Sequence, residues 1–283
     1  MRVYPKLSQW LMEHPGELDA LVFDIDGVLL INGGPTPGSG DLLAMLRREG
    51  LMVALLTNDG NNSTAQKAAA LRRSGIDVSG EELTSCSDGL VELAEERGLA
   101  GRLFFVMGNL GTPCFAEKAG LRATRDIERL PECSGVIVGD EGYDWEPVIN
   151  AVVNFFIHRP DALFVVPNPD EFYPSRPGEV KITSGGVGRF VQRVVAEYGV
   201  EISPVYLGKP HSPIFKKNHH ELERRRGGAI DRGRVLMVGD FLDSDIAGAN
   251  AFGYRSALML TGLTDLKRLE ASHIKPELVF ERF

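Results

Sequence analysis

Cysteine is scarce in this sequence, and long apolar runs are missing. Only three cysteines occur among 283 residues, at Cys86, Cys114 and Cys133. An odd number at wide spacing, with no CxxC or Cys/His pattern, argues against a disulfide framework and a structural zinc site. No run reaches the roughly 18 apolar residues of a membrane span. The N-terminal stretch, interrupted by Pro5 and Pro15, lacks the apolar core of a signal peptide. We therefore expect a cytoplasmic protein that does not span a membrane.

Positive charge is also in short supply. The chain has 31 Lys and Arg against 39 Asp and Glu, a formal net charge of −8. A protein that binds nucleic acid normally carries a basic patch or stripe, so we do not expect a nucleic-acid partner. With 43% hydrophobic and 25% charged residues, the composition is that of a globular protein with a sizeable core.

Short apolar runs alternate with helical patterns along the chain. The runs at 21–25 and 52–57 recur near the other end as 205–207, 235–238 and 256–260. Such alternation is typical of βαβ units on a parallel sheet that is covered by helices on both faces. The sequence therefore predicts an α/β fold with a doubly wound parallel sheet.

Polar side chains follow four of these predicted strands at the point where each strand ends. In an open parallel sheet, ligands bind outside the carboxyl ends of the strands. We therefore expect one crevice to gather three carboxylates, a hydroxyl, an amide and an ammonium group. The residues are Asp24, Asp26, Thr57, Asn58, Lys209 and Asp240.

This set of groups suits phosphoryl chemistry. Clustered carboxylates repel one another, and Mg²⁺ is the usual intracellular cation for such oxygen ligands, which makes Asp24 and Asp240 candidates. A lysine, a hydroxyl and an amide facing a metal would bind a phosphoryl group. A carboxylate can also be the nucleophile. Asp26 lies on the same face as Asp24 if the strand stays extended, and a turn starting at Gly27 would aim Asp26 at the leaving group.

Four motifs in this order resemble the signatures of the haloacid dehalogenase superfamily. They are DIDGVLL (24–30), LLTN (55–58), GKP (208–210) and GDFLDSDIAGA (239–249). The NPD motif at 168–170 resembles a mark of one subfamily, which includes the NagD-like, nitrophenyl and phosphoglycolate phosphatases. The resemblance implies a Rossmann-like core with an inserted α/β cap of the second class.

The resemblance also implies a role for each acid and for the lysine. Asp24 would be the nucleophile and a Mg²⁺ ligand. Asp26 would be the general acid and base, with its backbone carbonyl on the metal. Lys209 would stabilise the charge of the nucleophile and the phosphoryl group. Asp240 would bind the metal directly and Asp245 through water.

The phosphoryl oxygens would be held by residues of the first two motifs. The resemblance implies Thr57 and Asn58 for this contact, with Gly27 beside them. Asn168 and Asp170 either contact substrate or only form a turn at the border of the cap, and the sequence leaves both readings open.

The place of the cap follows from counting residues. The second aspartate of the first motif stands only 31 positions before Thr57, which one loop, one helix and one strand already use. Between Thr57 and Lys209 there are 152 positions, enough for a second domain. We expect a cap over 84–183 and a core formed by 1–83 and 184–283.

The presence of Asp26 favours phosphoryl transfer, because dehalogenases of this superfamily lack an acid at that position. The function we expect is Mg²⁺-dependent hydrolysis of a small phosphomonoester through an aspartyl phosphate, with a sugar phosphate or phosphoglycolate among the candidate substrates. A phosphotransferase or phosphomutase would use the same residues, and a non-catalytic phosphate-binding protein could share the scaffold. Members of the resembled subfamily often pair through the cap, so a homodimer is one candidate, and the sequence leaves the oligomeric state open.

Two further segments carry weaker signals. The glycine-rich stretch SGGVGRF (184–190) predicts a loop before a helix, because no GxGxxG spacing follows a strand there. His219, His220 and the run Arg224–Arg226 predict a solvated helix face.

Overall fold

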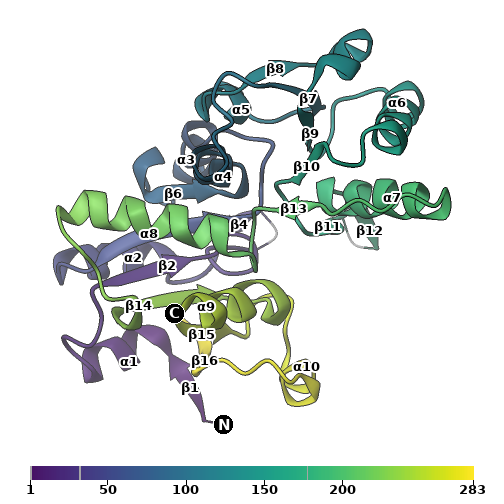
Figure 1. Cartoon of the computed structure of the whole chain (residues 1–283). Coiled ribbons are helices and arrows are strands. Elements are labelled where there is room, and N and C mark those ends of the chain that lie inside the picture. The colour runs from purple at the N-terminus through teal and green to yellow at the C-terminus, as the bar shows by residue number, and fades with distance from the viewer. Residues whose placement is uncertain (1, 32, 177) are drawn as a thin grey trace. The chain divides into compact units, whose positions relative to one another are not determined.

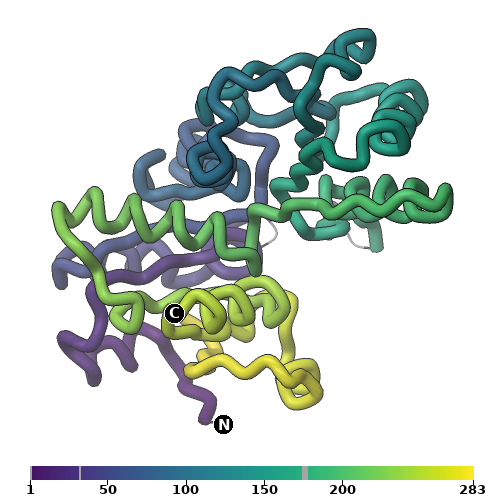
Figure 2. The backbone as a smooth tube through the Cα atoms, viewed as in Figure 1, coloured from purple at the N-terminus to yellow at the C-terminus, as the bar shows by residue number. Residues whose placement is uncertain are grey.

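The computed structural model of the chain describes residues 2–31, 33–176 and 178–283. The chain divides into two compact units (Figure 1). Figure 2 follows the backbone along both of them. Unit 1 comprises 1–57, 64–84 and 209–283, and unit 2 comprises 58–63 and 85–208.

Unit 1 is built on a seven-stranded sheet in the order β1-β16-β15-β14-β2-β5-β6. The central strand β2 has the sequence ALVF, and all four of its residues are buried. A strand that is apolar at every position is typical of a parallel sheet covered on both faces. The strands are β1 (Val3–Lys6), β2 (Ala20–Phe23), β5 (Met52–Thr57), β6 (Leu83–Ser85), β14 (Val235–Gly239), β15 (Arg255–Met259) and β16 (Leu278–Arg282).

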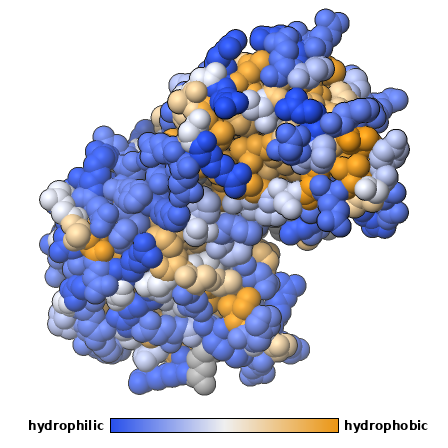
Figure 3. Space-filling model, viewed as in Figure 1, coloured by the Kyte–Doolittle hydropathy of each residue, from blue (hydrophilic) through white to orange (hydrophobic). Residues whose placement is uncertain are grey.

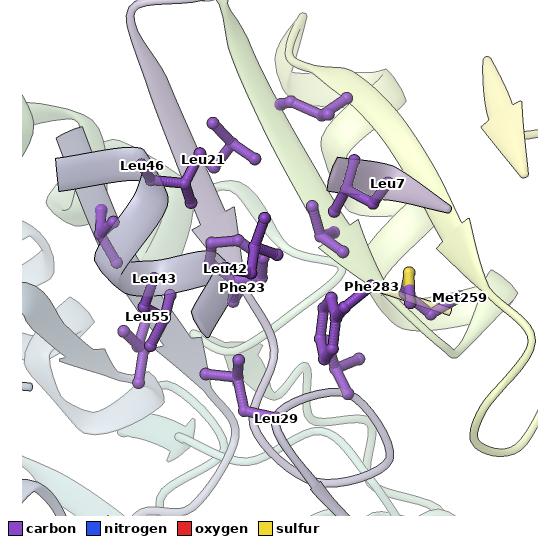
Figure 4. Packing of buried hydrophobic residues seen from close by; sticks show 14 of the residues in the cluster. Leu7, Leu21, Phe23, Leu29, Leu42, Leu43, Leu46, Leu55, Met259 and Phe283 are labelled. Atoms are coloured by element: carbon purple, nitrogen blue, oxygen red, sulfur yellow. The ribbon is translucent and has the colours of Figure 1, made fainter. Parts of the chain in front are cut away.

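The helices of unit 1 bury apolar side chains against this sheet. Figure 4 shows Leu21 and Phe23 of β2 meeting Leu42, Leu43 and Leu46 of α2 in one core. The elements are α1 (Leu7–Glu13), α2 (Ser39–Arg48), α3 (Thr64–Arg73), η1 (Gly80–Glu82), α8 (Ser212–Arg226), η4 (Arg232–Arg234), η5 (Leu242–Ile246), α9 (Ala247–Phe252), α10 (Leu266–Ala271) and the hairpin β3 (Leu30–Ile31) and β4 (Gly34–Pro35).

Unit 2 has its own parallel sheet in the order β13-β10-β9-β7-β8. Its strands are β7 (Leu103–Met107), β8 (Arg122–Thr124), β9 (Gly135–Val138), β10 (Leu163–Val166) and β13 (Val205–Tyr206), with a separate hairpin of β11 (Phe172–Arg176) and β12 (Glu179–Ile182). Its helices are η2 (Cys86–Asp88), α4 (Gly89–Glu96), α5 (Phe115–Lys118), η3 (Ile127–Glu132), α6 (Trp145–His158) and α7 (Ser184–Glu197). The α/β class with parallel sheets is confirmed.

One predicted strand lies in the other sheet. The sequence placed 205–207 in the sheet of the first motif, but β13 pairs with β10, Val165 opposite Val205. That prediction was wrong because α7 packs on the sheet of unit 2, with Val191 and Val195 in its core. A chain leaving a helix on one face returns to a neighbouring parallel strand of the same sheet. Unit 2 therefore continues to Gly208, past the border predicted near Thr183.

The surface of unit 2 carries several large apolar side chains. Figure 3 shows apolar residues on its visible face, and Phe172, Val180 and Ile182 of the hairpin are 55%, 59% and 63% exposed. Within the described ranges, no helix has both the length and the apolar character needed to cross a membrane.

Candidate active site

Asp24 stands at the carboxyl end of the central strand of unit 1. β2 ends at Phe23, and the backbone N–H of Asp24 donates to the carbonyl of Val238 at 2.9 Å. The chain then turns, because Gly27 has a φ of +88°. The turn expected at Gly27 is therefore present, although the strand ends before Asp24. The Asp26 side chain is 74% exposed and lies 3.6 Å from Nζ of Lys67.

Asp240 and Asp245 come from the neighbouring strand β14 and the turn η5. Asp240 follows β14 directly, and the wide turn brings Asp245 back towards it. Oδ2 of Asp245 accepts from the N–H groups of Asp240 at 3.2 Å and Phe241 at 3.1 Å. One oxygen each of Asp24, Asp240 and Asp245 lies within 4.8 Å of the others.

Glycines allow these carboxylates to sit so close to backbone. A Cβ atom on Gly27 or Gly262 would overlap the carboxylate of Asp240, and one on Gly239 would overlap Asp245. Gly27 donates its N–H to the carbonyl of Leu30 at 2.7 Å. Its amide is therefore used inside the turn, and the absence of a side chain is what the carboxylate of Asp240 requires.

Lys209 supplies the positive charge of the cluster. Its Nζ lies 2.6 Å from Oδ1 of Asp24 and 2.8 Å from Oδ1 of Asp245. It also donates to the backbone carbonyl of Leu56 at 3.1 Å. The side chain is only 3% exposed, so the positive charge is held in a fixed place beside Asp24 and Asp245.

Burial and the neighbouring charges shift the pKa values of three groups in this cluster. Burial raises the pKa of Asp24 well above its usual range, and Asp245 and Asp240 raise it further against the opposing effect of Lys209. Burial, with the charge of Asp245, raises the pKa of Asp240 to about 7. For Lys209, burial would lower the pKa, but Asp24 and Asp245 outweigh it and raise the pKa above its usual range.

Three carboxylates with one ammonium suit a divalent cation. The donors are all carboxylate oxygens, which hard cations such as Mg²⁺ prefer. Burial, and after it the repulsion between neighbouring carboxylates, raises the pKa values of Asp24 and Asp240. A cation among them would favour their charged forms. The residues present therefore fit Mg²⁺.

The remaining predicted contacts are divided between the units. Thr57 is the last residue of β5 in unit 1 and is buried. Asn58 is covalently next to it but belongs to unit 2, where its Nδ2 donates to Oδ2 of Asp170 at 3.0 Å. Asn168 joins this group, because its Oδ1 accepts from the N–H of Asp170 at 3.0 Å.

One of the weaker sequence predictions was wrong and another was wrong in part. The glycines of 184–190 lie inside α7, which begins at Ser184, and a glycine is needed at 185 because a Cβ there would overlap the backbone of Asp170. On the predicted solvated face, His220 and Arg224 are exposed, but His219 is buried, with its Nδ1 3.1 Å from the hydroxyl of Tyr254. In both cases, packing that the local pattern does not encode decides the environment.

Sequence reasoning missed Lys67 and Asp140. A lysine in an alanine-rich helix reads as solvated, and nothing in the sequence connects Lys67 with Asp26. Asp140 did carry a signal, because it follows β9 directly after Gly139. Ligands gather at the carboxyl ends of parallel strands, and the second sheet has such ends as well as the first.

Two family models match the chain. One, described as haloacid dehalogenase-like hydrolase, matches residues 21–122. The other, described as HAD-hydrolase-like, matches residues 206–283. The first contains Asp24 and Thr57, and the second contains Lys209 and Asp240.

Individual relatives extend the likeness over nearly the whole chain. Chronophin from Mus musculus is 29% identical over 265 residues, which is 90% of this chain and 85% of that protein. A solved structure described as a possible sugar phosphatase of the HAD superfamily, from Cytophaga hutchinsonii, has a TM-score of 0.81 at 25% identity and covers 100% of this chain and 98% of its own. The glycerol phosphate phosphatase of Mycobacterium tuberculosis, solved in complex with magnesium, has a TM-score of 0.76 at 23% identity, covering 93% and 74%.

Proposed function

The chain belongs to the haloacid dehalogenase-like hydrolases, and on that premise we propose that it hydrolyses a small phosphomonoester through an aspartyl-phosphate intermediate. It is a phosphoric monoester hydrolase, the class of enzyme to which the descriptions of similar proteins refer. The observation that carries the proposal is the position of Lys209 Nζ, 2.6 Å from Asp24 and 2.8 Å from Asp245. That geometry holds one carboxylate at the end of β2 beside a fixed positive charge.

The first half of the reaction uses Asp24 and Asp26. A carboxylate oxygen of Asp24 attacks phosphorus, and the bond between phosphorus and the ester oxygen breaks. The leaving oxygen takes a proton from Asp26. Lys209, with its ammonium group beside Asp24, reduces the negative charge that attacker and phosphoryl group bring together.

The second half returns the enzyme to its starting state. Asp26, now a carboxylate, takes a proton from water, and the resulting hydroxide attacks phosphorus of the acyl phosphate. Inorganic phosphate leaves, and the carboxylate of Asp24 is restored. The exposure of Asp26, 74% for its side chain, suits a group that meets both a leaving group and water.

We also propose the residues that hold Mg²⁺ and the phosphoryl group. Asp24, Asp240 and the backbone carbonyl of Asp26 would bind the metal directly, and Asp245 would bind it through water. When bound, Mg²⁺ supplies positive charge against the phosphoryl oxygens. This assignment draws support from the three carboxylates grouped in unit 1 and from the magnesium complex of the relative.

The phosphoryl oxygens would meet residues at the end of β5. Thr57 ends that strand, beside β2 in the parallel sheet. We assign its hydroxyl, together with Asn58, to the phosphoryl oxygens. Substrate selection would then fall to unit 2 as the cap.

Two features of the whole protein complete the proposal. Pairing of two copies through unit 2 is supported by the exposed apolar hairpin, and Ile182→Asp should then lower the mass measured by light scattering to that of one chain.

A cytoplasmic location is supported by the three free, buried cysteines.

Release of inorganic phosphate tests the function. Wild-type protein with Mg²⁺ should release phosphate from members of a phosphomonoester panel, and Asp24→Asn should not, although its fold stays intact. Phosphate release also separates hydrolysis from phosphotransfer to a second hydroxyl, which leaves no free phosphate. An inactive wild type across the panel, or an active Asp24→Asn, would contradict the proposal.

A further inference from the structure

Asn58 is held from three sides within unit 2. Its Nδ2 donates to Oδ2 of Asp170 at 3.0 Å, although 112 positions separate the two residues. Its backbone carbonyl accepts from Sγ of Cys86 at 3.1 Å. Its Oδ1 packs against Gly208, where a Cβ would come within 2.5 Å of it. The side chain of Asn58 therefore has a defined orientation.

The partner at position 170 decides which way the amide of Asn58 faces. An ionised carboxylate only accepts hydrogen bonds, so the NH₂ group must point at Asp170. The flipped amide would place its oxygen against the carboxylate and leave the NH₂ group against Gly208. The direction of the second N–H of Asn58 is fixed in the same way.

The backbone of Asp170 is itself held by two hydrogen bonds. Its N–H donates to Asn168 Oδ1 at 3.0 Å, which forms a turn, and its carbonyl accepts from the hydroxyl of Thr183. Gly185 at the start of α7 gives this loop room, since a side chain there would overlap Pro169 and Asp170.

Further hydrogen bonds connect this loop with Asp140 at the carboxyl end of β9. Oδ1 of Asp140 accepts from the N–H of Ser184 at 2.7 Å. The hydroxyl of Ser184 in turn donates to the carbonyl of Asn168 at 3.0 Å. A continuous set of hydrogen bonds thus runs from the sheet of unit 2 through α7 and the 168–170 loop to Asn58.

We propose that Asp170 is a positioning residue, which aims the amide of Asn58 at the phosphoryl group and does not contact substrate itself. A turn alone would not need the carboxylate, because Asn168 and backbone groups close it. The proposal rests on the proposed function, in which Asn58 contacts the phosphoryl oxygens. It gives Asp170 a role that differs from both readings left open by the sequence.

A double-mutant cycle on the full chain tests this role. The variants are Asn58→Ala, Asp170→Ala and the double variant, with kcat, KM and inhibition by inorganic phosphate measured on 4-nitrophenyl phosphate. Each single variant should lower kcat/KM roughly 10- to 100-fold, because a misplaced contact loses that much, and should weaken phosphate inhibition. The double variant should be no worse than Asn58→Ala, since Asp170 acts through that residue.

Two further variants separate positioning from folding. Asp170→Asn keeps a carbonyl oxygen that accepts from Asn58, so its kcat/KM should stay within a few-fold of wild type. Glu171→Ala is the matched control, because Glu171 is an exposed acid in the same loop, 3.3 Å from Arg189, and should change nothing. If Asp170→Ala does not fold, Asp170→Ser, which is too short to reach Asn58, takes its place in the cycle.

The outcomes distinguish this inference from the proposed function. Losses that multiply in the double variant would show that Asp170 acts on substrate directly and would overturn the inference alone. So would an Asp170→Ala variant with a lower Tm and unchanged kinetics, or an Asp170→Asn variant as impaired as Asp170→Ala. An inactive wild type would contradict the proposed function. An unimpaired Asn58→Ala variant would contradict the premise that Asn58 contacts the phosphoryl group, and the inference with it.

Discussion

The ammonium nitrogen of Lys209 lies 2.6 Å from Oδ1 of Asp24, a residue 185 positions earlier in the chain. The pair is largely inaccessible to water, with side chains 3% and 15% exposed. Lys209 also lies 2.8 Å from Asp245. One cation therefore compensates two carboxylates, and a third, Asp240, stands beside them.

Replacement of Lys209 by methionine should affect both activity and stability. Loss of the charge should lower kcat about 10²- to 10³-fold, as loss of a fixed electrostatic contact does. Without Mg²⁺ the folded state should lose about 3–5 kcal/mol, because buried carboxylates stay unpaired. The loss should be smaller at pH 5 than at pH 8, since the pKa of Asp240 is raised to about 7 by burial and by Asp245, and this carboxyl is neutral at pH 5.

Urea unfolding of the metal-free protein at the two pH values measures the stability effect. The control is Lys217→Met on α8, whose partner Glu221 lies 2.9 Å away in a partly exposed pair on the same helix. A solvated pair of this kind contributes about 0–1 kcal/mol. Equal effects of the two substitutions would rule out the charge balance proposed for Lys209.

The sequence was sufficient to predict that Asp24 and Asp240 lie close together. Asp24 and Asp240 each follow an apolar strand, and parallel strands place their carboxyl ends at one edge. Lys209 was also predicted to lie near these acids, but on the expectation that the strand before it belongs to the first sheet. It follows β13, a strand of the second sheet, yet its ammonium group contacts the acids of the first unit.

The unpredicted parts of the structure depend on long-range packing. Which sheet a two-residue strand such as β13 joins depends on the helix before it, and α7 is fixed by contacts of Gly185 with the 168–170 loop. His219 lies between aromatic rings of distant residues, among them Tyr254. Local periodicity reports one face of a helix, but it does not identify the element that covers it.

Asp26→Asn should impair poor leaving groups most. The variant can no longer donate or accept the transferred proton, and an alkyl phosphate needs that proton far more than 4-nitrophenyl phosphate does. We expect kcat to fall at least about 10²-fold for an alkyl phosphate and less for the nitrophenyl ester. Steady-state kinetics on both esters make the comparison. Asp243→Asn, an exposed acid in η5, is the control, and identical losses on both esters would exclude Asp26 as the general acid.

Removal of divalent metal should inactivate the enzyme reversibly. Chelation leaves Asp24, Asp240 and Asp245 with Lys209 as the nearest compensating charge, so phosphate release should stop and return when Mg²⁺ is added. Binding should also be visible without turnover. The Tm of Asp24→Asn, which lacks one of the three charges, should rise less with Mg²⁺ than the Tm of wild type. Full activity in excess chelator would exclude the metal assignment.

Asp140 should make the stability of the protein depend on pH. Burial raises its pKa to about 6 against the hydrogen bond from Ser184, and Asp59 adds to the rise. Because the folded state holds the proton more tightly than the unfolded state, this contribution is complete below about pH 4 and is lost as the pH rises through 6. The loss should be about 2–3 kcal/mol in total.

Comparison with Asp140→Asn isolates this contribution, because the amide does not titrate and all other groups are shared. The free energy of unfolding of the variant relative to wild type should increase between pH 4 and pH 7 and then stay constant. Urea unfolding at unit intervals of pH measures the difference. Asp161→Asn, at a site whose side chain is 79% exposed, should run parallel to wild type throughout. If Asp140→Asn also ran parallel, the carboxyl of Asp140 would titrate as an ordinary surface acid, and its place as the buried anchor of α7 would be wrong.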